Sequence, residues 1–566
     1  MSTDPRSDIP SPCSEDPVTA GSLSRRDFLT GTGIAGIAAA STPMALPAGE
    51  PPEPPDGTPE QIHLTWGEDP CTMVCVSWAC PAQAANPRVE FGAGSAGTRT
   101  VHAVQRIYTD GINGLTVFTY HARLDALAPG TKFRYAVTAD NDRQRGTPFT
   151  GEFTTAPRGR AAFRWTSYGD LATPVTRWSH SSEQSRHAVQ AVERFQPLFH
   201  LLNGDLCYAN VNPTSQPQVW ADFGRNVQAS ASRRPWMPCP GNHEIEFHNG
   251  AQGMDAYLTR YSLPANGTAF PGRWYSFRVG TAVFVSLSAD DVIYQDCGPF
   301  IIGPSPLRPA PSTGNAPIEP GTSLQVYGYS GGAQTRWLEQ TLAGAASDPD
   351  VDWIIVQMHQ DALSSSRTGN GSDRGLREAW LPLFDRYGVD LVLCGHDHDY
   401  ERSWPVRGCN HDVGRDARTG ATVDTWQPRP TTTQEPADGR FDTSHGTIHL
   451  ILGGGGTSLP CDVYGAAADT GRPQAKVFTR RNPPQPTGVP GTFMRVGADA
   501  IEEAVWSARR DAGTGYGIAV FDLDPDMPDA HTSITIRYYH APGADRTPTP
   551  DYELFETVVV RKKRRK

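Results

Sequence analysis

Five short segments place aspartate, asparagine, tyrosine or histidine directly after an apolar run. They are Tyr168-Gly169-Asp170 and the segments 204–208 (GDLCY), 241–244 (GNHE), 356–359 (VQMH) and 395–398 (GHDH). Carboxylate, amide, phenol and imidazole groups together suit first-row transition metals, whereas calcium takes oxygen ligands only. In four segments a glycine precedes the ligand, which lets the backbone turn sharply and approach an ion. The five segments predict a transition-metal site.

The spacing within two segments supports this interpretation. Asp205 and Tyr208 are three residues apart and can face the same way on a helical turn, and His396 and His398 can do so in an extended segment. Taken singly, each motif has an ordinary structural interpretation, because a Gly-Asp pair is usually a turn and a lone histidine is usually structural or solvated. Five such motifs together in one α/β region favour a functional site over five separate structural roles.

The elements that must position these residues begin near residue 160. Apolar runs that stop abruptly at polar residues occupy 162–167, 198–202, 236–237, 353–356 and 389–393. Helices are predicted at 185–195, 335–342 and 376–387, and late strands at 447–452, 517–522, 533–539 and 552–560. Apolar strands that alternate with helices indicate a buried, layered α/β architecture, in which ligands collect where strands end in loops. The Pro/Gly/Thr-rich segments 301–321 and 406–445 are predicted to be long surface loops.

A second, all-β domain is predicted ahead of this region, over residues 60–158. Short alternating segments separated by turn residues occupy 61–66, 73–79, 88–91, 119–124, 133–138 and 151–155. This pattern is typical of a small β-sandwich. Residues 127–133 (LAPGTKF) resemble the E–F corner of a fibronectin type III domain. We expect this domain to contribute packing and not chemistry.

The five segments behind a sandwich domain resemble the metallophosphoesterase signature, specifically that of purple acid phosphatases. The resemblance covers residues 60–560, and 395–402 (GHDHDYER) is its most specific stretch. It implies an α/β catalytic domain over 160–560 built as a four-layer β-sandwich. It also implies a binuclear centre, with Asp170, Tyr208 and His398 on the first metal, Asn242, His359 and His396 on the second, and Asp205 bridging both. Fe(III) is expected at the first site, and Fe(II), Zn(II) or Mn(II) at the second.

The implied activity is hydrolysis of phosphate monoesters, because two ions about 3.5–4 Å apart can hold a phosphate and activate a water. His243 is the candidate to orient substrate or protonate the leaving alcohol, with a supporting structural role as the alternative. Arg367 stands where plant members carry substrate-binding histidines and is a candidate phosphate clamp; a solvated loop arginine is the alternative. A further departure is Leu171-Ala172 after Asp170, where the family often has glycine at the second position.

Two other functions remain open alternatives. One is a phosphodiesterase or phospholipase that uses the same binuclear site. The other is a catalytically inactive phosphate- or surface-binding protein. Mono- and diester substrates assayed side by side separate the enzymatic alternatives, and a metal-replete protein without turnover would favour the inactive one.

The N-terminus resembles a twin-arginine export signal. Arg25-Arg26 lies in the segment 24–29 (SRRDFL), and a mildly apolar stretch follows at 30–40. The expectation is a signal peptide over 1–48, a Pro/Glu-rich linker over 49–59, and export by the twin-arginine machinery to a secreted, periplasmic or cell-wall-associated location. A disordered N-terminal tail or a weak amphipathic helix is the alternative. The basic tail at 561–566 is predicted to be disordered or to touch anionic surfaces.

Composition and charge limit the classes of partner and of location that the chain can have. The chain has 566 residues, 50 basic and 61 acidic, with a net charge of −11, which argues against a nucleic-acid partner. The partners that the resemblance implies are small phosphate esters. No uninterrupted apolar run is long enough for a transmembrane segment. Cys71, Cys75 and Cys80 lie close together without a matching Cys/His pair downstream, so one or two disulfides are predicted in place of a zinc site.

Overall fold

The computed structural model describes residues 57–564 except for short internal stretches, of which the longest are 302–327 and 459–470. These residues belong to one compact unit, Pro55–Lys566. The predicted signal segment, most of the predicted linker and most of the predicted loop 301–321 lie outside the described residues.

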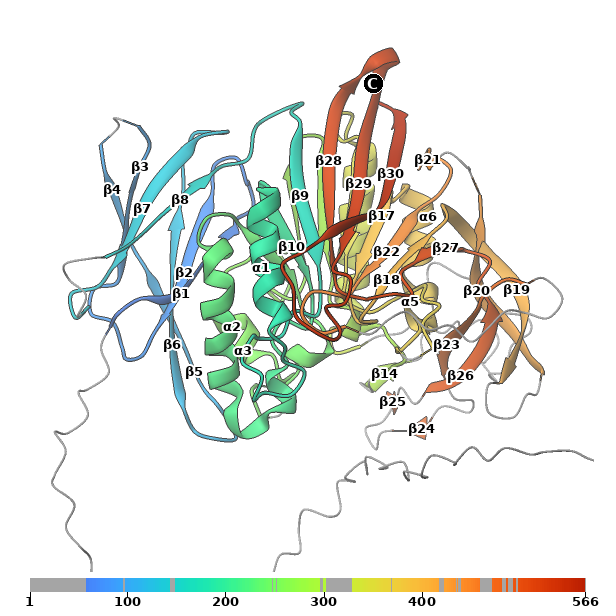
Figure 1. Cartoon of the computed structure of the whole chain (residues 1–566), viewed down its shortest axis with the longest axis horizontal. Helices are drawn as coiled ribbons and strands as arrows, with labels where there is room; N and C mark the ends of the chain where they lie inside the picture. The colour runs from blue at the N-terminus through green and yellow to red at the C-terminus, as the bar shows by residue number, and fades with distance from the viewer. Residues whose placement is uncertain are drawn as a thin grey trace, which may run out of the picture. The chain divides into compact units, whose positions relative to one another are not determined.

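Eight strands build the all-β domain, drawn in blue to cyan in Figure 1. They are β1 (Glu60–Trp66), β2 (Val74–Cys80), β3 (Arg88–Gly92), β4 (Arg99–His102), β5 (Val104–Thr109), β6 (Thr116–Leu124), β7 (Lys132–Thr138) and β8 (Phe149–Thr154). They form two four-stranded sheets, ordered β1-β2-β6-β5 and β4-β3-β7-β8. All six predicted strands are present, and β4 and β5 were missed because most of their residues are exposed and the apolar alternation is weak.

Inward-facing apolar side chains hold this domain together. In β7 buried and exposed residues alternate, so that Phe133 and Tyr135 face the core, and Phe133 stacks on Phe153 with ring centroids 5.5 Å apart. The Tyr135 hydroxyl donates to the carbonyl of Ser232, 2.6 Å away in the catalytic region, and the Ile62 amide donates to Gln228 Oε1 at 2.9 Å. The domain therefore packs directly against the catalytic region.

Two seven-stranded sheets form the centre of the catalytic region. The first has the order β11-β10-β9-β28-β29-β30-β21 and the second β12-β13-β15-β17-β22-β18-β27. The strands of the first are β9 (Phe163–Tyr168), β10 (Phe199–Asn203), β11 (Trp236–Cys239), β21 (Arg440–Phe441), β28 (Gly517–Met527), β29 (His531–His540) and β30 (Glu553–Lys563). Those of the second are β12 (Tyr275–Val279), β13 (Ala282–Ser286), β15 (Trp353–Gln357), β17 (Leu391–Cys394), β18 (Tyr400–Ser403), β22 (Ile448–Leu452) and β27 (Ser507–Arg510).

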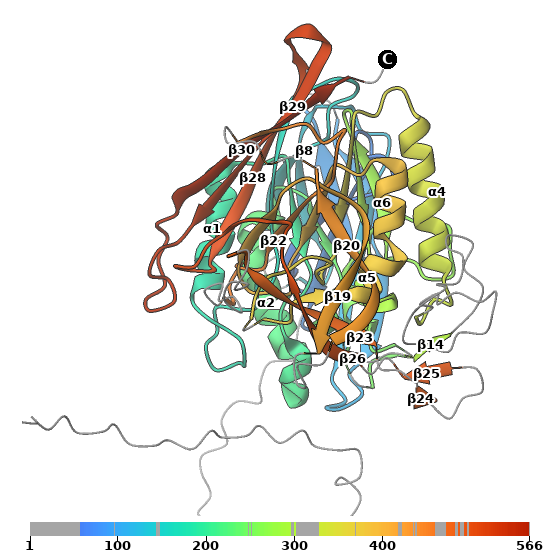
Figure 2. The same ribbon diagram turned by 90° about the vertical axis from the view of Figure 1, so that its right-hand side faces the viewer.

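The two sheets face each other and helices cover their outer sides. Trp165 stacks on Phe521 within the first sheet, with centroids 4.7 Å apart, and meets Phe284 of the second edge-to-face at 5.3 Å. One side is covered by α1 (Gln184–Phe195), α2 (Gln216–Ala231) and α3 (Asp255–Arg260), the other by α4 (Ala333–Ser347), α5 (Arg374–Ala379) and α6 (Leu381–Tyr387) (Figures 1 and 2). The predicted four-layer arrangement is confirmed.

The helix predicted at 376–387 is two helices, α5 and α6, with a break at Trp380. Pro382 lies in the first turn of α6, where its missing N–H and fixed φ are tolerated. Helix α2 was not predicted, although Val219, Phe223 and Val227 recur at four-residue intervals and are buried.

The prediction of a surface loop over 406–445 is wrong. The first part of this segment is an antiparallel pair, β19 (Val406–Asp416) and β20 (Thr422–Thr432), in a sheet of order β16-β23-β26-β19-β20. The partners are β16 (Ser372–Asp373), β23 (Gln474–Arg480) and β26 (Gly497–Glu503), and a smaller sheet joins β14 (Pro299–Ile301), β25 (Thr492–Met494) and β24 (Gln485–Pro486). Backbone pairing forms these strands although the sequence lacks an apolar period.

The predicted disulfides are wrong for the cysteines described, because Cys71 and Cys75 are free thiols and the Cys80 thiol donates to the Gly57 carbonyl at 3.3 Å. Cys75 and Cys80 lie five residues apart in β2, about 16 Å along an extended strand, whereas a disulfide needs Cα atoms about 4.4–6.8 Å apart. The Cys71 thiol donates instead to the Pro157 carbonyl, 3.4 Å away.

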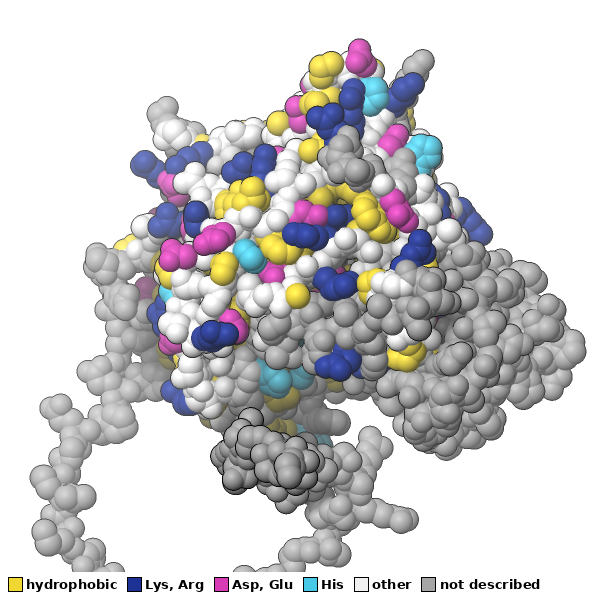
Figure 3. Space-filling view, turned by 45° about the vertical axis from the view of Figure 1, so that its right-hand side comes forward, with side chains coloured by type: hydrophobic (Ala, Val, Ile, Leu, Met, Phe, Trp, Pro, Cys, Tyr) yellow, Lys and Arg dark blue, Asp and Glu magenta, His cyan; other side chains and the backbone are white. Residues whose placement is uncertain are grey.

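The chain's C-terminal end also differs from the prediction. Strand β30 continues through Lys563, so the first residues of the predicted basic tail lie in the sheet. Lys562 is buried and forms an ion pair with Asp390 at 2.6 Å, which accounts for its place in the strand. On the face drawn in Figure 3, basic and acidic side chains are interspersed. No helix among the described residues is long and apolar enough to cross a membrane.

Candidate metal centre

The seven predicted metal ligands all lie in loops that follow parallel strands of the two central sheets. Strands β9, β10 and β11 run parallel to one another, as do β13, β15, β17 and β22. Asp170 follows β9, Asp205 and Tyr208 follow β10, Asn242 follows β11, His359 follows β15, and His396 and His398 follow β17. The carboxyl ends of these strands thus deliver all seven side chains, as the sequence predicts.

Four of these ligand positions adopt a left-handed backbone, which is uncommon for residues other than glycine. The φ angles are 59° at Asp170, 49° at Asp205, 60° at Tyr208 and 67° at His396. Such conformations cost about 1–3 kcal/mol each and persist where surrounding structure over-determines them, as at functional sites. Ala172 also has a positive φ of 55°, at the position where the resemblance leads one to expect glycine. The backbone at Ala172 is therefore in a region that glycine adopts more readily than alanine.

The glycines of the motifs are needed for close approach. A Cβ atom on Gly241 would collide with the Asp205 carboxylate, and one on Gly395 would crowd the carboxylate of Asp170. Glycine at these positions therefore lets neighbouring loops press against the acidic side chains.

Asp170, Tyr208 and His398 form a first cluster, here named the tyrosine group. The Tyr208 hydroxyl donates to Asp170 Oδ1 at 3.0 Å and lies 3.0 Å from His398 Nε2, which in turn lies 3.3 Å from Asp170 Oδ1. Burial and the charges of Asp170 and Asp205 raise the pKa of Tyr208 well above its ordinary value. A bound cation of high charge would reverse this effect and favour the phenolate. Three donor atoms thus converge on one point.

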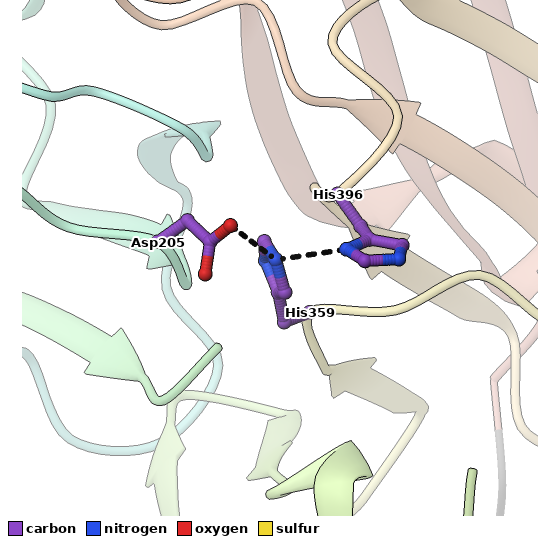
Figure 4. Close-up of side chains that lie close together, drawn as sticks. All are labelled: Asp205, His359 and His396. Atoms are coloured by element: carbon purple, nitrogen blue, oxygen red, sulfur yellow. Dashed lines mark hydrogen bonds and ion pairs between the residues drawn. The ribbon is translucent and has the colours of Figure 1, made fainter. Parts of the chain in front are cut away.

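Asp205, His359 and His396 form a second cluster, and together with Asn242, the predicted ligand that follows β11, they are here named the imidazole group. Donor atoms of Asp205, His359 and His396 all lie within 4.8 Å of one another, and all three side chains are buried. His359 Nε2 lies 3.0 Å from Asp205 Oδ2 and 3.3 Å from His396 Nδ1, so the His359 ring stands between the carboxylate and the second imidazole (Figure 4).

In both His359 and His396, the ring nitrogen that points away from the other histidine donates a hydrogen bond to a neighbouring residue. His359 Nδ1–H donates to the Asn203 carbonyl at 2.7 Å, and His396 Nε2–H donates to Gln295 Oε1 at 3.0 Å. The two nitrogens that face each other therefore carry lone pairs, and a proton or a metal ion must lie between them. Burial disfavours a charge on His359, but the Asp205 and Asp170 carboxylates outweigh it and raise the pKa of His359 to about 10. A positive charge is thus favoured at this place.

Asn242 supplies a second sign that a cation fits. Its side-chain oxygen is buried and has no hydrogen-bond partner within the described residues. An unsatisfied buried acceptor costs about 1–3 kcal/mol, which ligation to a metal would remove. Asp205 and Asn242 are held near each other because the Glu244 carboxylate accepts the amides of Asp205 at 2.9 Å and Gly241 at 2.7 Å.

Glu244, Asn203 and Gln295 are supporting residues that sequence reasoning missed. Glu244 stands inside the GNHE segment, so its acidic side chain next to the predicted ligand was a usable signal. Burial and the neighbouring Asp205 raise the pKa of Glu244 well above its ordinary value. Asn203 acts through its backbone carbonyl and Gln295 reaches the site from a distant segment, so neither carried a signal in the sequence.

His243, the predicted catalytic residue, lies beside both groups. Its amide donates to Asp205 Oδ1 at 2.9 Å, its Nδ1–H donates to Asn210 Oδ1 at 2.7 Å, and its Nε2 lies 3.9 Å from Asp205 Oδ2. The side chain is 21% exposed, which leaves part of it accessible at the site. Arg367 is exposed on the loop between Ser366 and Gly369, and its role stays a prediction.

His180 is a further residue at the site that the sequence analysis did not single out. Its ring stacks on that of Tyr208, with centroids 4.9 Å apart and an interplanar angle of 16°, and lies 5.9 Å from the ring of His243. Its only signal in the sequence is its position ten residues after Asp170.

Known families match both parts of the chain. A model described as the N-terminal domain of purple acid phosphatase matches residues 59–155, and a model described as calcineurin-like phosphoesterase matches residues 169–400. In structure, the chain resembles a purple acid phosphatase from yellow lupin (Lupinus luteus) seeds, with a TM-score of 0.59 and 18% identity, covering 90% of this chain and 75% of that one. This likeness shows a shared fold.

Two relatives are similar in sequence. An uncharacterized protein of Mycobacterium tuberculosis is 38% identical over 549 residues, which cover 92% of this chain and 93% of the relative. The Fe(3+)-Zn(2+) purple acid phosphatase 12 of Arabidopsis thaliana is 25% identical over 374 residues, covering 64% of this chain and 68% of the relative. With its all-β domain, its metallophosphoesterase domain and these matches, the chain belongs to the purple acid phosphatase family and is a metal-dependent phosphoesterase.

Proposed function

We propose that the chain is an exported acid phosphatase that hydrolyses phosphate monoesters at a binuclear metal centre. The observation that carries this proposal is the meeting of the tyrosine and imidazole groups at one edge of the sheets. The His396 amide donates to Asp170 Oδ2 at 2.9 Å, so a backbone contact joins the two groups. Asp205, beside His359 and His243, is the proposed bridging ligand between them.

The donor chemistry of the groups differs and suits different metals. Asp170, Tyr208 and a shared Asp205 make a hard, anionic set that favours Fe(III), with His398 completing it. Asn242, His359 and His396 with the shared carboxylate favour Fe(II), Zn(II) or Mn(II). The Fe(3+)-Zn(2+) relative supports this assignment.

The metals would supply Lewis acidity toward the phosphate oxygens and would lower the pKa of a water. The protein's own groups do the positioning. Asn203 and Gln295 fix the ring orientations of His359 and His396. Because Nδ1 of His243 is bonded to Asn210, its Nε2 is the atom that orients the substrate or passes a proton to the leaving alcohol. Arg367 is proposed to hold phosphate oxygens.

Elemental analysis combined with a visible spectrum tests the centre. We expect iron and a second transition metal in the purified protein, and a visible absorption band from the Tyr208 phenolate on ferric iron. In Tyr208→Phe the band should disappear, while Tyr387→Phe on α6 should keep it. A protein without any transition metal would overturn the proposal. An unchanged colour in iron-loaded Tyr208→Phe would show that Tyr208 is not a ligand of the iron.

The substrate class and export are tested separately. Monoester and diester substrates assayed side by side should show faster hydrolysis of the monoester, and a preference for diesters would favour the alternative phosphodiesterase or phospholipase. Export through the twin-arginine route predicts that replacement of Arg25 and Arg26 by lysine retains the protein inside the cell, as measured by fractionation.

A further inference from the structure

His180 presents an unused imidazole beside the proposed substrate site. The residue is exposed, and its ring covers one face of the Tyr208 ring. Within the described part of the chain, neither of its ring nitrogens has a hydrogen-bond partner. The imidazole can therefore offer an N–H to a bound molecule.

The backbone of His180 is held firmly in position. It has a left-handed φ of 62°, and its carbonyl accepts a hydrogen bond from Thr457 Oγ1 at 2.7 Å. The preceding residues are anchored too, because the Ser179 amide donates to Asn212 Oδ1 at 3.0 Å and the Trp178 indole donates to Asp222 Oδ2 at 2.9 Å. The loop therefore presents the ring in one place, as a binding residue requires.

The surroundings of His180 suit an anionic ligand. Its ring lies 5.9 Å from that of His243 and stacks on that of Tyr208, a member of the tyrosine group. The His398 side chain, 18% exposed, also contacts Tyr208, with its Nε2 3.0 Å from the Tyr208 hydroxyl. Three imidazoles from three different loops, those of His180, His243 and His398, thus lie around the buried ring of Tyr208.

We propose that His180 is a substrate-binding residue whose imidazole N–H donates a hydrogen bond to a non-bridging oxygen of the phosphate ester. It supplies, from the loop after β9, an imidazole that the segment around Arg367 does not contain. The inference rests on the proposed phosphatase function and names a further residue of that site.

The test separates hydrogen bonding from packing. His180→Phe keeps a ring to stack on Tyr208 and removes the N–H, while His180→Asn restores a donor. His102→Phe, at an exposed histidine of β4, is the matched control. The measurements are the Kd of inorganic phosphate for the metal-loaded protein by calorimetry, KM and kcat for a monoester, metal content and the visible spectrum.

We expect His180→Phe to weaken phosphate binding and to raise KM about ten-fold, the effect of one lost hydrogen bond to a charged group, with kcat changed less than about three-fold. Metal content and the visible band should stay as in the wild type, and His180→Asn should recover part of the affinity. An unchanged phosphate Kd in metal-replete His180→Phe would overturn the role of His180 and leave the proposed phosphatase function standing. A wild type without metal or hydrolysis would overturn the proposed function, and the inference with it.

Discussion

The tyrosine group and the imidazole group come from the same kind of strand-end loop but satisfy their polar atoms differently. In the tyrosine group, the Tyr208 hydroxyl has partners in both Asp170 and His398, at 3.0 Å each. In the imidazole group, the Asn242 oxygen has no partner among the described residues, and His359 and His396 direct two nitrogens at each other across 3.3 Å.

This difference teaches that the two groups depend on a cation to different extents. The tyrosine group can close on itself through hydrogen bonds. The imidazole group needs a proton or a metal ion, because two facing lone pairs and an unpaired buried amide oxygen are unfavourable. We therefore expect metal loss to disturb the imidazole group more than the tyrosine group.

The largest effect is expected from Asp205→Asn, because this carboxylate is the proposed bridge between the groups. Loss of its charge should remove at least one metal and lower kcat by more than about 10³-fold, the scale of losing a core part of the catalytic machinery. Metal content and turnover measure the result. Asp352→Asn, which removes a buried carboxylate paired with Arg160 at 2.6 Å away from the predicted ligands, is the control. A full complement of both metals in Asp205→Asn would contradict the bridge.

His243→Asn sharpens the comparison, since His243 contacts both groups without belonging to either. We expect kcat to fall about 10²–10⁴-fold, the usual contribution of general acid–base catalysis, with metal content intact. His187→Asn on α1 serves as the control. If activity and metal were lost together, the role of His243 would be to support the ligands.

A smaller effect is expected on the thermal stability of the metal-free protein when the pH is changed. The pKa of His359 is raised from 6.5 to about 10 by Asp205 and Asp170 against the effect of burial. Its stabilisation is therefore fully present below pH 6.5 and is lost as pH rises through about 10. We expect the Tm of the chelator-treated protein to fall over this window, and that of the metal-loaded protein to fall less.

Thermal unfolding of His359→Gln provides the matched comparison for this pH dependence. The variant lacks the titrating imidazole, so its metal-free Tm should depend less on pH between 6.5 and 10. Parallel curves for the wild type and the variant would show that the imidazole group does not hold a proton when metal is absent.

The smallest effect is expected from Arg367→Ala, because Arg367 is exposed and its contact with phosphate would be screened by solvent. KM for a monoester should rise about three- to ten-fold with kcat nearly unchanged. Arg336→Ala, on α4, is the control. Equal KM values for the two variants would leave Arg367 as a solvated loop arginine, which is the open alternative.

The sequence predicts the strands that precede the ligands because their apolar runs end abruptly at polar residues, whereas β12 and β13 of the second sheet were not predicted. The runs before Asp170, Asp205 and His359 became β9, β10 and β15. The resemblance supplied the pairing of ligands, which no local pattern contains. Segments without an apolar period, such as β19 and β20, were misjudged because backbone pairing with distant strands forms them.

What the sequence determined by itself is the set of donor groups and their attachment to strand ends, because glycine, apolar runs and ligand residue types are local properties. What only the tertiary structure decided is how these donors meet. The left-handed backbone at Asp170 and Tyr208, the hydrogen bond that Gln295 accepts from His396, and the stacking of His180 on Tyr208 all depend on contacts between distant segments. Such contacts arise from packing of the whole chain, and no local pattern of residues encodes them.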